Sequence, residues 1–460
     1  MEILIKNGKV INAGGSFKAD VLVRNGKIAA IGRGLDGKTA SKTIDASGLY
    51  VLPGAIDAHT HLEMAMGKTF SADGYESGTR AAACGGTTTV FDYTLQEKGK
   101  PMLEEIADRN RLAEPAACVD YAFHGGISEV NEARLNEVAE MAKQGFPSIK
   151  AYMTYAFGLD DKALFELLQR AAKERVLITV HAESHGIVEA NREEFKKEGL
   201  TDVWYHYLSR PEIAEEEADI RAITLARAAG APIYIVHLGN EAGARYIAKA
   251  RAEGIPVYAE TCPHYLAFTN EVFQRPDGIR FICSPPMKGK ESQIALWEGV
   301  SRGVIDTIAT DHCPAQTFEK DWGKEDFTLA PCGVMGIENM YPYMLNAANK
   351  GMISFEKAVE VCSANPARIF GCDTKGAIAP GLDADIVLYD PKKEFTITVD
   401  KMHSNIDYTI YEGMKLKGYP VLTMSRGTTV YKDGEFMGTA GYGRLLRRRI
   451  SCGYKPVEEG

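Results

Sequence analysis

The sequence has no arrangement of cysteines that predicts a disulfide framework or a small zinc-binding motif. Its nine cysteines are an odd number, scattered from Cys84 to Cys452, and no two of them have the Cys-x-x-Cys spacing. A chain of 460 residues can bury a large hydrophobic core without cross-links. Because unpaired thiols are typical of a reducing compartment, we expect the protein to reside in the cytoplasm.

Long apolar runs and an excess of positive charge are also missing. No stretch approaches the roughly 20 apolar residues of a membrane-spanning helix. The segment MEILIKNGKVI carries Glu2 and Lys6 where a secretory signal would be apolar. The formal net charge of −9 argues against nucleic acid as the main partner. We therefore expect neither a membrane nor a nucleic acid as partner.

One basic run near the C-terminus departs from this acidic balance. It consists of Arg444, Arg447, Arg448 and Arg449. Because the chain as a whole is acidic, we expect this tail to pair with an acidic surface or with a neighbouring subunit.

The two ends of the chain have the pattern of β structure. Asn7-Gly8 and Asn25-Gly26 lie between apolar alternations, which predicts hairpins with tight turns. Residues 385–389 predict a strand, and Asp433-Gly434 predicts a further hairpin. Since chain termini often lie close together, we expect residues 1–52 and 375–460 to form one small β-sandwich domain.

Between these ends, from residue 53 to residue 374, short apolar runs alternate with helical patterns. The segment DDKALFELLQRAAKE has apolar residues at helical spacing and an N-cap at Asp160 or Asp161, and EARLNEVAEMAKQG ends at Gly145, suited to a helix end. Eight runs have the composition of buried strands: YVLPGAIDAHTH, TTTVFDY, VDYAFHGGI, SIKAYMTY, LITVHAE, PIYIVHLG, PVYAETCP and DTIATDH. This alternation predicts an α/β fold, a parallel (β/α)8 TIM barrel, with catalytic groups at the carboxyl ends of the strands.

Residue types that bind metal ions recur at the ends of these predicted strands. They are His59, His61, Lys150, His181, His237 and Asp311. In a strand, residues i and i+2 point to the same side, so His59 and His61 can reach one ion. Lone histidines are often core residues, but two at equivalent positions of consecutive units favour ligands. The pattern predicts a metal-dependent hydrolase.

Two members of the set have other interpretations. A charged, unpaired lysine inside a barrel is costly, so Lys150 could instead extend its ammonium group to the surface or form a buried ion pair. Asp311 could also serve as a helix N-cap or as a salt-bridge partner. The pattern alone leaves these alternatives open.

At these residues the chain resembles the cyclic amidohydrolases, in particular the hydantoinases and dihydropyrimidinases. The likeness covers nearly the whole chain. Beside the ligands it includes GTRAAACGGTTT (78–89), HAES (181–184), ETCPHYL (260–266), CSPPMK (283–288), ATDHCP (309–314), SANPARIFG (363–371) and SRGTTVYKDGEF (425–436). Several such motifs in one chain are highly specific.

The resemblance implies a site for two divalent metal ions. The family's ligands match His59, His61 and Asp311 for the more buried ion, His181 and His237 for the more exposed ion, and Lys150 as a bridge. Lys150 would carry a carbamate formed from carbon dioxide, as N6-carboxylysine. Nitrogen and oxygen ligands suit zinc, and manganese or cobalt would also fit.

The resemblance also implies the reaction, which is hydrolytic ring opening of cyclic amides to N-carbamoyl amino acids. The substrates would be 5-substituted hydantoins, dihydropyrimidines or both, and a hydroxide between the metals would attack the ring carbonyl. Tyr155 would stabilise the developing oxyanion, and Asp311 would carry the proton to the leaving nitrogen. Ser284 and Asn339 match positions that hold the ring. The family implies a homotetramer.

Related activities remain as alternatives. Dihydroorotases are expected to carry an arginine just after His-x-His, where this chain has Leu62 and Glu63. Allantoinases usually lack an equivalent of Tyr155, but allantoinase activity stays open. A non-catalytic scaffold, like the neuronal collapsin-response proteins, would have lost the ligands that are intact here.

The ring that is opened, and its D or L stereochemistry, are not determined by the sequence. Residues 63–68 predict a loop over the site, and candidates to line the substituent pocket are Met64, Met66, Tyr152 and Leu159. Because methionine adapts to many shapes, a bulky apolar or aromatic substituent would fit.

Overall fold

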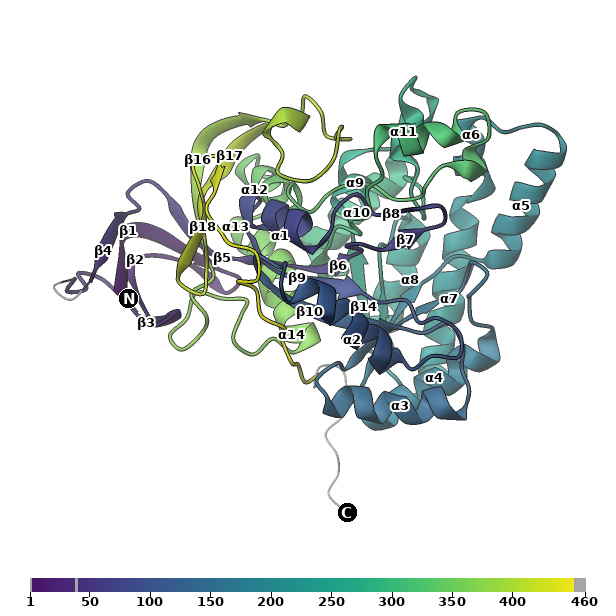
Figure 1. The fold of residues 1–460 in the computed structure, drawn as a ribbon, viewed down its shortest axis with the longest axis horizontal. Coiled ribbons are helices and arrows are strands. Elements are labelled where there is room, and N and C mark those ends of the chain that lie inside the picture. Colours follow the sequence, from purple (N-terminus) through teal and green to yellow (C-terminus); the bar gives the residue numbers. More distant parts are fainter. Residues whose placement is uncertain (1, 38–39, 451–460) are drawn as a thin grey trace, which may run out of the picture.

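Two β-sheets organise the chain, which is described here by a computed structural model for residues 2–37 and 40–450 (Figure 1). One is a ring of parallel strands surrounded by helices, and the other is a mixed sheet. In the mixed sheet the purple N-terminal strands lie beside the yellow C-terminal strands. The predicted α/β fold, a (β/α)8 barrel with a β domain from both chain ends, is confirmed. Cys452 lies outside the described residues.

The barrel forms from the eight runs that the sequence indicates. Its strands are β6 (Ala55–Thr60), β9 (Thr87–Tyr93), β10 (Asp120–Gly126), β11 (Ser148–Tyr152), β12 (Leu177–His181), β13 (Ile233–Ile235), β14 (Val257–Thr261) and β15 (Thr307–Ile308). They pair in parallel and in sequence order. The ring closes where His61 N–H donates to the His312 carbonyl at 2.9 Å. This pairing puts the carboxyl ends of all these strands at one rim.

Helices cover the outside of the ring. The longer ones are α1 (Tyr75–Cys84), α2 (Met102–Ala113), α3 (Glu132–Lys143), α4 (Asp161–Glu174), α5 (His185–Lys197), α6 (Val203–Ser209), α7 (Glu212–Ala229), α8 (Glu241–Ala252), α10 (Lys290–Arg302) and α12 (Met340–Asn349). The predicted ends are confirmed: Asp160 caps α4 by accepting from Ala163 N–H at 2.8 Å, and Gly145 has φ 85° just after α3.

Shorter segments complete the loops around the rim and the link to the mixed sheet. They are the hairpin β7 (Ala65–Met66) and β8 (Thr69–Phe70), the helices α9 (Pro263–Ala267), α11 (Thr317–Lys320), α13 (Phe355–Val359) and α14 (Asn365–Phe370), the 3₁₀ turns η1 (Asn270–Gln274), η2 (Gly278–Phe281), η3 (Asp321–Gly323), η4 (Phe327–Leu329) and η6 (Val399–Lys401), and the π turn η5 (Glu360–Ala364).

The mixed sheet takes strands from both ends of the chain. They are β1 (Glu2–Asn12), β2 (Gly15–Arg24), β3 (Lys27–Gly32), β4 (Lys42–Asp45), β5 (Tyr50–Pro53), β16 (Ile386–Thr396), β17 (Lys415–Ser425), β18 (Thr428–Lys432) and β19 (Glu435–Phe436). It curls so that Lys27 on β3 pairs with Asp383, and it encloses its own apolar core. We keep 1–52, 53–374 and 375–460 as proposed domain limits.

The Asn-Gly pairs do not all form turns. Asn25-Gly26 joins β2 to β3 as predicted, but Asn7-Gly8 lies inside β1, where the prediction of a hairpin is wrong. Asn7 has φ 64° at a bulge. The bulge divides β1 into a first half that pairs with β4 and a second half that pairs with β5. A bulge uses the same positive φ as a tight turn, so local sequence does not separate the two.

The C-terminal basic run differs from its prediction at Arg448. Residues 443–450 run along the barrel, where Tyr121 N–H donates to the Arg444 carbonyl at 3.0 Å and Leu446 N–H to the Tyr121 carbonyl at 2.7 Å. The Arg448 side chain is buried and donates to backbone carbonyls rather than to an acidic surface. The reason is that carbonyl oxygens can satisfy guanidinium donors where no carboxylate lies nearby.

Within the described residues, none of the helices combines the length and the apolar character needed to cross a membrane. The eight cysteines in the same part of the chain are all free thiols.

A buried charge cluster joins the barrel to the mixed sheet. Lys375 Nζ lies 2.8 Å from Asp120 on β10, 2.6 Å from Asp385 and 3.3 Å from Asp383. Burial opposes the lysine charge, but the carboxylates of Asp385, Asp120 and Asp383 outweigh it and raise the pKa of Lys375. The barrel and the mixed sheet are therefore held together by a buried cation that is fully paired with carboxylates.

Lys375→Met should destabilise the protein by about 3–5 kcal/mol, because it leaves buried carboxylates without their cation. Urea denaturation midpoints measure the effect. Lys162→Met is the control, since Lys162 is 82% exposed and its pairing with Glu166 contributes at most about 1 kcal/mol. Equal midpoints for the two variants would contradict the role of the cluster.

Candidate active site

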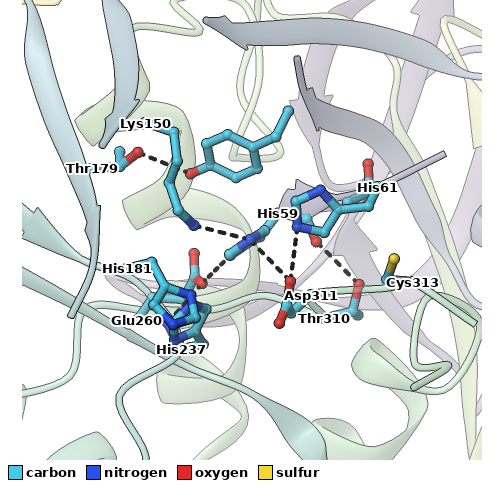
Figure 2. Close-up of polar contacts among 12 residues, drawn as sticks. His59, His61, Lys150, Thr179, His181, His237, Glu260, Thr310, Asp311 and Cys313 are labelled. Atoms are coloured by element: carbon cyan, nitrogen blue, oxygen red, sulfur yellow. Dashed lines mark hydrogen bonds and ion pairs between the residues drawn. The ribbon is translucent and has the colours of Figure 1, made fainter. Parts of the chain in front are cut away.

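Six of the predicted site residues meet at the carboxyl rim of the barrel (Figure 2). They come from different strands or from the residues just after them: His59, His61, Lys150, His181, His237 and Asp311. His237 and Asp311 both have positive φ, at 39° and 49°. Such backbone strain is typical of functional sites, where the surrounding structure holds it.

The first half of the site consists of two histidines and a carboxylate. Asp311 Oδ1 lies 3.1 Å from His59 Nε2 and 3.0 Å from His61 Nε2. Burial raises the pKa of Asp311, but His59 and His61 outweigh it and hold that pKa well below its usual range. The carboxylate is thus an anion facing two ring nitrogens, which is an arrangement that can hold a metal ion.

The second half consists of two histidines whose ring nitrogens face each other. His237 Nε2 lies 2.9 Å from His181 Nδ1. His181 Nε2 lies 2.8 Å from Glu183, and Glu183 accepts from Arg210 at 2.6 Å. If His181 Nε2 donates to this carboxylate, Nδ1 keeps a lone pair directed into the site.

Glu260 orients the two halves, and sequence reasoning did not assign it a role. Its Oε1 lies 2.7 Å from His59 Nδ1 and accepts from the backbone N–H of His237 at 3.1 Å. If His59 Nδ1 donates to Glu260, the lone pair of His59 Nε2 points towards Asp311. Its position at the carboxyl end of predicted strand β14, within the motif ETCPHYL, was the available signal.

Lys150 lies between the two halves without an ion partner. Its Nζ is 3.4 Å from His59 Nε2 and 4.5 Å from the centre of the Tyr93 ring, and among the described residues no carboxylate comes within salt-bridge distance. Burial lowers the pKa of Lys150 to about 8, against the pull of Asp311 and Glu260. The structure therefore gives no support to the alternative of a buried ion pair.

These donors fit the metal ions that the family resemblance implies. They are nitrogen and oxygen atoms of suitable types. The second ring nitrogens of His59 and His181 are held by Glu260 and Glu183, respectively. Lys150 has no anion beside it, and two imidazole nitrogens face each other at 2.9 Å. Cations, with a carbamate on the lysine, would satisfy both features.

A cavity of about 620 Å³ opens onto these residues. Of the predicted substrate-binding residues, Tyr155 and Ser284 line it, and Asn339 does not. Tyr155 has φ 72°, and its ring centre is 5.1 Å from that of His181. Burial raises the pKa of Tyr155 well above its usual value, so the hydroxyl keeps its proton. Asn339 lies instead at the start of α12.

The outer part of the cavity is largely apolar. Of the candidates for its wall, Met64, Met66 and Tyr152 line it, whereas Leu159 does not and packs in the core. The remaining apolar wall comes from Leu95, Phe157, Trp322, Leu329, Ala330 and Pro331. Trp322 and Leu329 belong to short 3₁₀ turns after the barrel strands, whose proximity to the site no local pattern shows.

Comparison with known proteins agrees with this arrangement. The Amidohydrolase family pattern matches residues 50–430. A D-phenylhydantoinase of Escherichia coli O1:K1 / APEC is 42% identical over 454 residues, 98% of both chains. The crystal structure of dihydropyrimidinase from Brevibacillus agri NCHU1002 is 39% identical with a TM-score of 0.96, covering 98% of this chain and 99% of that one.

An enzyme named for the opposite stereochemistry is also similar. The L-hydantoinase (dihydropyrimidinase) of Arthrobacter aurescens is 33% identical with a TM-score of 0.90, covering 97% of this chain and 99% of that one. The match of the family pattern over most of the chain, and the full-length likeness to these enzymes, lead to one conclusion. The protein belongs to the amidohydrolase family of metal-dependent hydrolases.

Proposed function

We propose that this protein hydrolyses the ring amide of 5-substituted hydantoins, dihydropyrimidines or both, producing N-carbamoyl amino acids. The observation that carries the proposal is the convergence of four histidines, Lys150 and Asp311 at the rim, beside a cavity that Tyr155 lines. Full-length likeness to enzymes named hydantoinase and dihydropyrimidinase supports the same reaction.

The proposal includes two divalent metal ions, with zinc preferred and manganese or cobalt as alternatives. His59, His61 and Asp311 would hold one ion, His181 and His237 the other, and a carbamate on Lys150 would bind both. When bound, the ions would supply an activated water molecule as nucleophile and polarise the ring carbonyl. The lowered pKa of Lys150 increases the share of the neutral amine, the form that reacts with carbon dioxide.

The chain's own groups would then stabilise charge and move the proton. Tyr155 keeps its hydroxyl proton and would donate it in a hydrogen bond to the carbonyl oxygen as negative charge builds there. Asp311 is ionised and would accept the proton of the attacking water. It would return that proton to the ring nitrogen as the carbon–nitrogen bond breaks, leaving an acid and a free carbamoyl nitrogen.

Two further roles remain proposals. Ser284, which lines the cavity, would hold the ring largely through backbone groups, and the same role for Asn339, which does not line the cavity, stays a prediction. The protein would act as a homotetramer in the cytoplasm. The apolar wall around Met64, Phe157 and Trp322 favours a bulky apolar or aromatic substituent on the ring.

A rate comparison tests the reaction itself. With zinc-loaded protein, we expect hydrolysis of 5-phenylhydantoin and dihydrouracil, each clearly faster than hydrolysis of allantoin. Separate enantiomers of the hydantoin would assign the stereochemistry. Metal-loaded protein that opens none of these rings would support the scaffold alternative, and a preference for allantoin would identify an allantoinase.

Lys150→Ala should remove the group that would bridge the two ions and most of the bound metal with it. Elemental analysis of the purified variant measures the loss. Lys143→Ala, at an exposed position on α3, should keep the metal content of the wild type. Unchanged metal in Lys150→Ala would refute the carbamate.

Tyr155→Phe should keep its metal but lower kcat by roughly 10²- to 10³-fold, the effect of removing one donor to an oxyanion. Steady-state kinetics and elemental analysis on the same sample separate the two outcomes. Tyr246→Phe, on the outer helix α8, is the matched control. If kcat did not change, Tyr155 would serve only in packing.

A further inference from the structure

The C-terminal segment 443–450 places a buried arginine inside the barrel, away from the cavity. Arg448 is only 2% exposed, whereas its neighbours Arg447 and Arg449 are exposed. In Figure 1 the yellow end of the chain runs from the mixed sheet past α14 towards α3. The backbone N–H of Arg448 donates to the Gly145 carbonyl, just after α3, at 3.0 Å.

Glycines leave the space that this segment occupies. A Cβ at Gly371 would lie 2.1 Å from the Arg449 carbonyl oxygen, and one at Gly443 would lie 2.0 Å from that of Val119. Neither distance is possible for a larger residue without a backbone shift. The docking of the segment is therefore a specific feature of the packing rather than a loose end lying on the surface.

In the part of the chain that the structure describes, the Arg448 guanidinium binds groups inside the ring and no carboxylate. Its Nη2 donates to the Phe123 carbonyl at 2.6 Å and to Ser148 Oγ at 2.9 Å, and Nη1 donates to the Phe370 carbonyl at 3.2 Å. The guanidinium carbon is 4.6 Å from the centre of the Phe91 ring. These contacts come from β9, β10, β11 and α14, so the arginine ties four elements together.

Ser148 passes this contact on to His124. Because a guanidinium only donates, Ser148 Oγ accepts from Arg448, and the same oxygen lies 2.7 Å from His124 Nδ1. The Ala58 carbonyl can only accept, so His124 Nε2 carries the ring proton and donates to it at 3.1 Å. Burial holds the pKa of His124 well below its usual value, so the ring is neutral and its Nδ1 accepts from Ser148. These contacts select one tautomer of His124. Ala58, to which His124 donates, directly precedes His59.

The His124 ring also stacks under the candidate metal ligands. It lies 4.3 Å from the Tyr93 ring at an angle of 19°. The Tyr93 ring in turn contacts His59 edge to face at 4.5 Å, and Lys150 Nζ lies 4.5 Å above its centre. Ser148 is two residues before Lys150 on the same strand. A continuous column of buried groups thus leads from Arg448 to two proposed ligands.

We propose that Arg448 is a positioning residue of the metal centre. Through Ser148 it fixes the His124 ring, which stacks on the Tyr93 ring that His59 and Lys150 contact. The C-terminal segment therefore helps to position two proposed metal ligands. This role rests on the metal site of the proposed function. Mutation of a group that orients metal ligands without touching the metal typically lowers metal affinity by about 10- to 100-fold.

The test compares two arginines of the same segment in the full-length, zinc-loaded protein. Release of zinc to a chromogenic chelator should be about tenfold faster in Arg448→Ala than in the wild type. This is the lower end of the range for groups that orient metal ligands from outside. Arg447→Ala should release zinc at the wild-type rate. Its side chain lies outside the barrel, where it donates to the Gln144 carbonyl at 2.7 Å.

A second variant separates positioning from folding. Ser148→Ala removes only the hydroxyl between Arg448 and His124, so it should also speed zinc release, with little change in the melting temperature of the metal-free protein. Adding Arg448→Ala to it should increase release by less than the product of the two single effects, because both act through one path. If Arg448→Ala alone fails to fold, the Ser148→Ala result decides.

The outcomes that would overturn the idea are distinct. Wild-type zinc release in folded Ser148→Ala and Arg448→Ala, with only a lower melting temperature, would reduce Arg448 to a structural role and leave the proposed function intact. A wild-type protein that binds no metal would overturn the proposed function and, with it, this role.

Discussion

Closure of the parallel ring is the constraint on which the rest of the structure depends. Only because β15 returns to β6, with His61 N–H donating to the His312 carbonyl, does Asp311 come within 3.1 Å of His59. Parallel pairing also gives all the strands one direction, so that groups at or just after the ends of β6, β12 and β13 lie at the same rim. The mixed sheet adds no residue to the six that meet there.

The buried cations differ in their partners, and this difference distinguishes cations with a structural role from a lysine proposed to act in the reaction. Lys375 is surrounded by carboxylates, Lys320 donates to the carbonyls of residues 282, 331 and 333, and Arg448 donates to carbonyls and a hydroxyl. Among the described residues, Lys150 has aromatic rings and a histidine nitrogen beside it and no carboxylate within ion-pair distance. A buried ammonium without an anion is costly, so this is the position where a modification or a metal is expected.

Periodic segments were predictable because their physics is local. All eight barrel strands, the cap at Asp160 and the turn at Asn25-Gly26 follow from apolar patterning and turn chemistry. The prediction failed at Asn7-Gly8, where a bulge uses the same backbone angles as a turn, and for Arg448, whose partners are carbonyls remote in sequence. Leu159 was expected in the cavity, but it packs in the core.

The sequence by itself determined the strands, the residue types at their ends and, through its motifs, the family, because each is written in short stretches of chain. Only the tertiary structure decided which groups orient those ligands and what shapes the cavity. Glu260 acts on His59, Trp322 lines the same cavity as Met64, and Arg448 reaches the barrel interior. Such contacts join segments that are neighbours solely after the ring has closed, so no local pattern carries them.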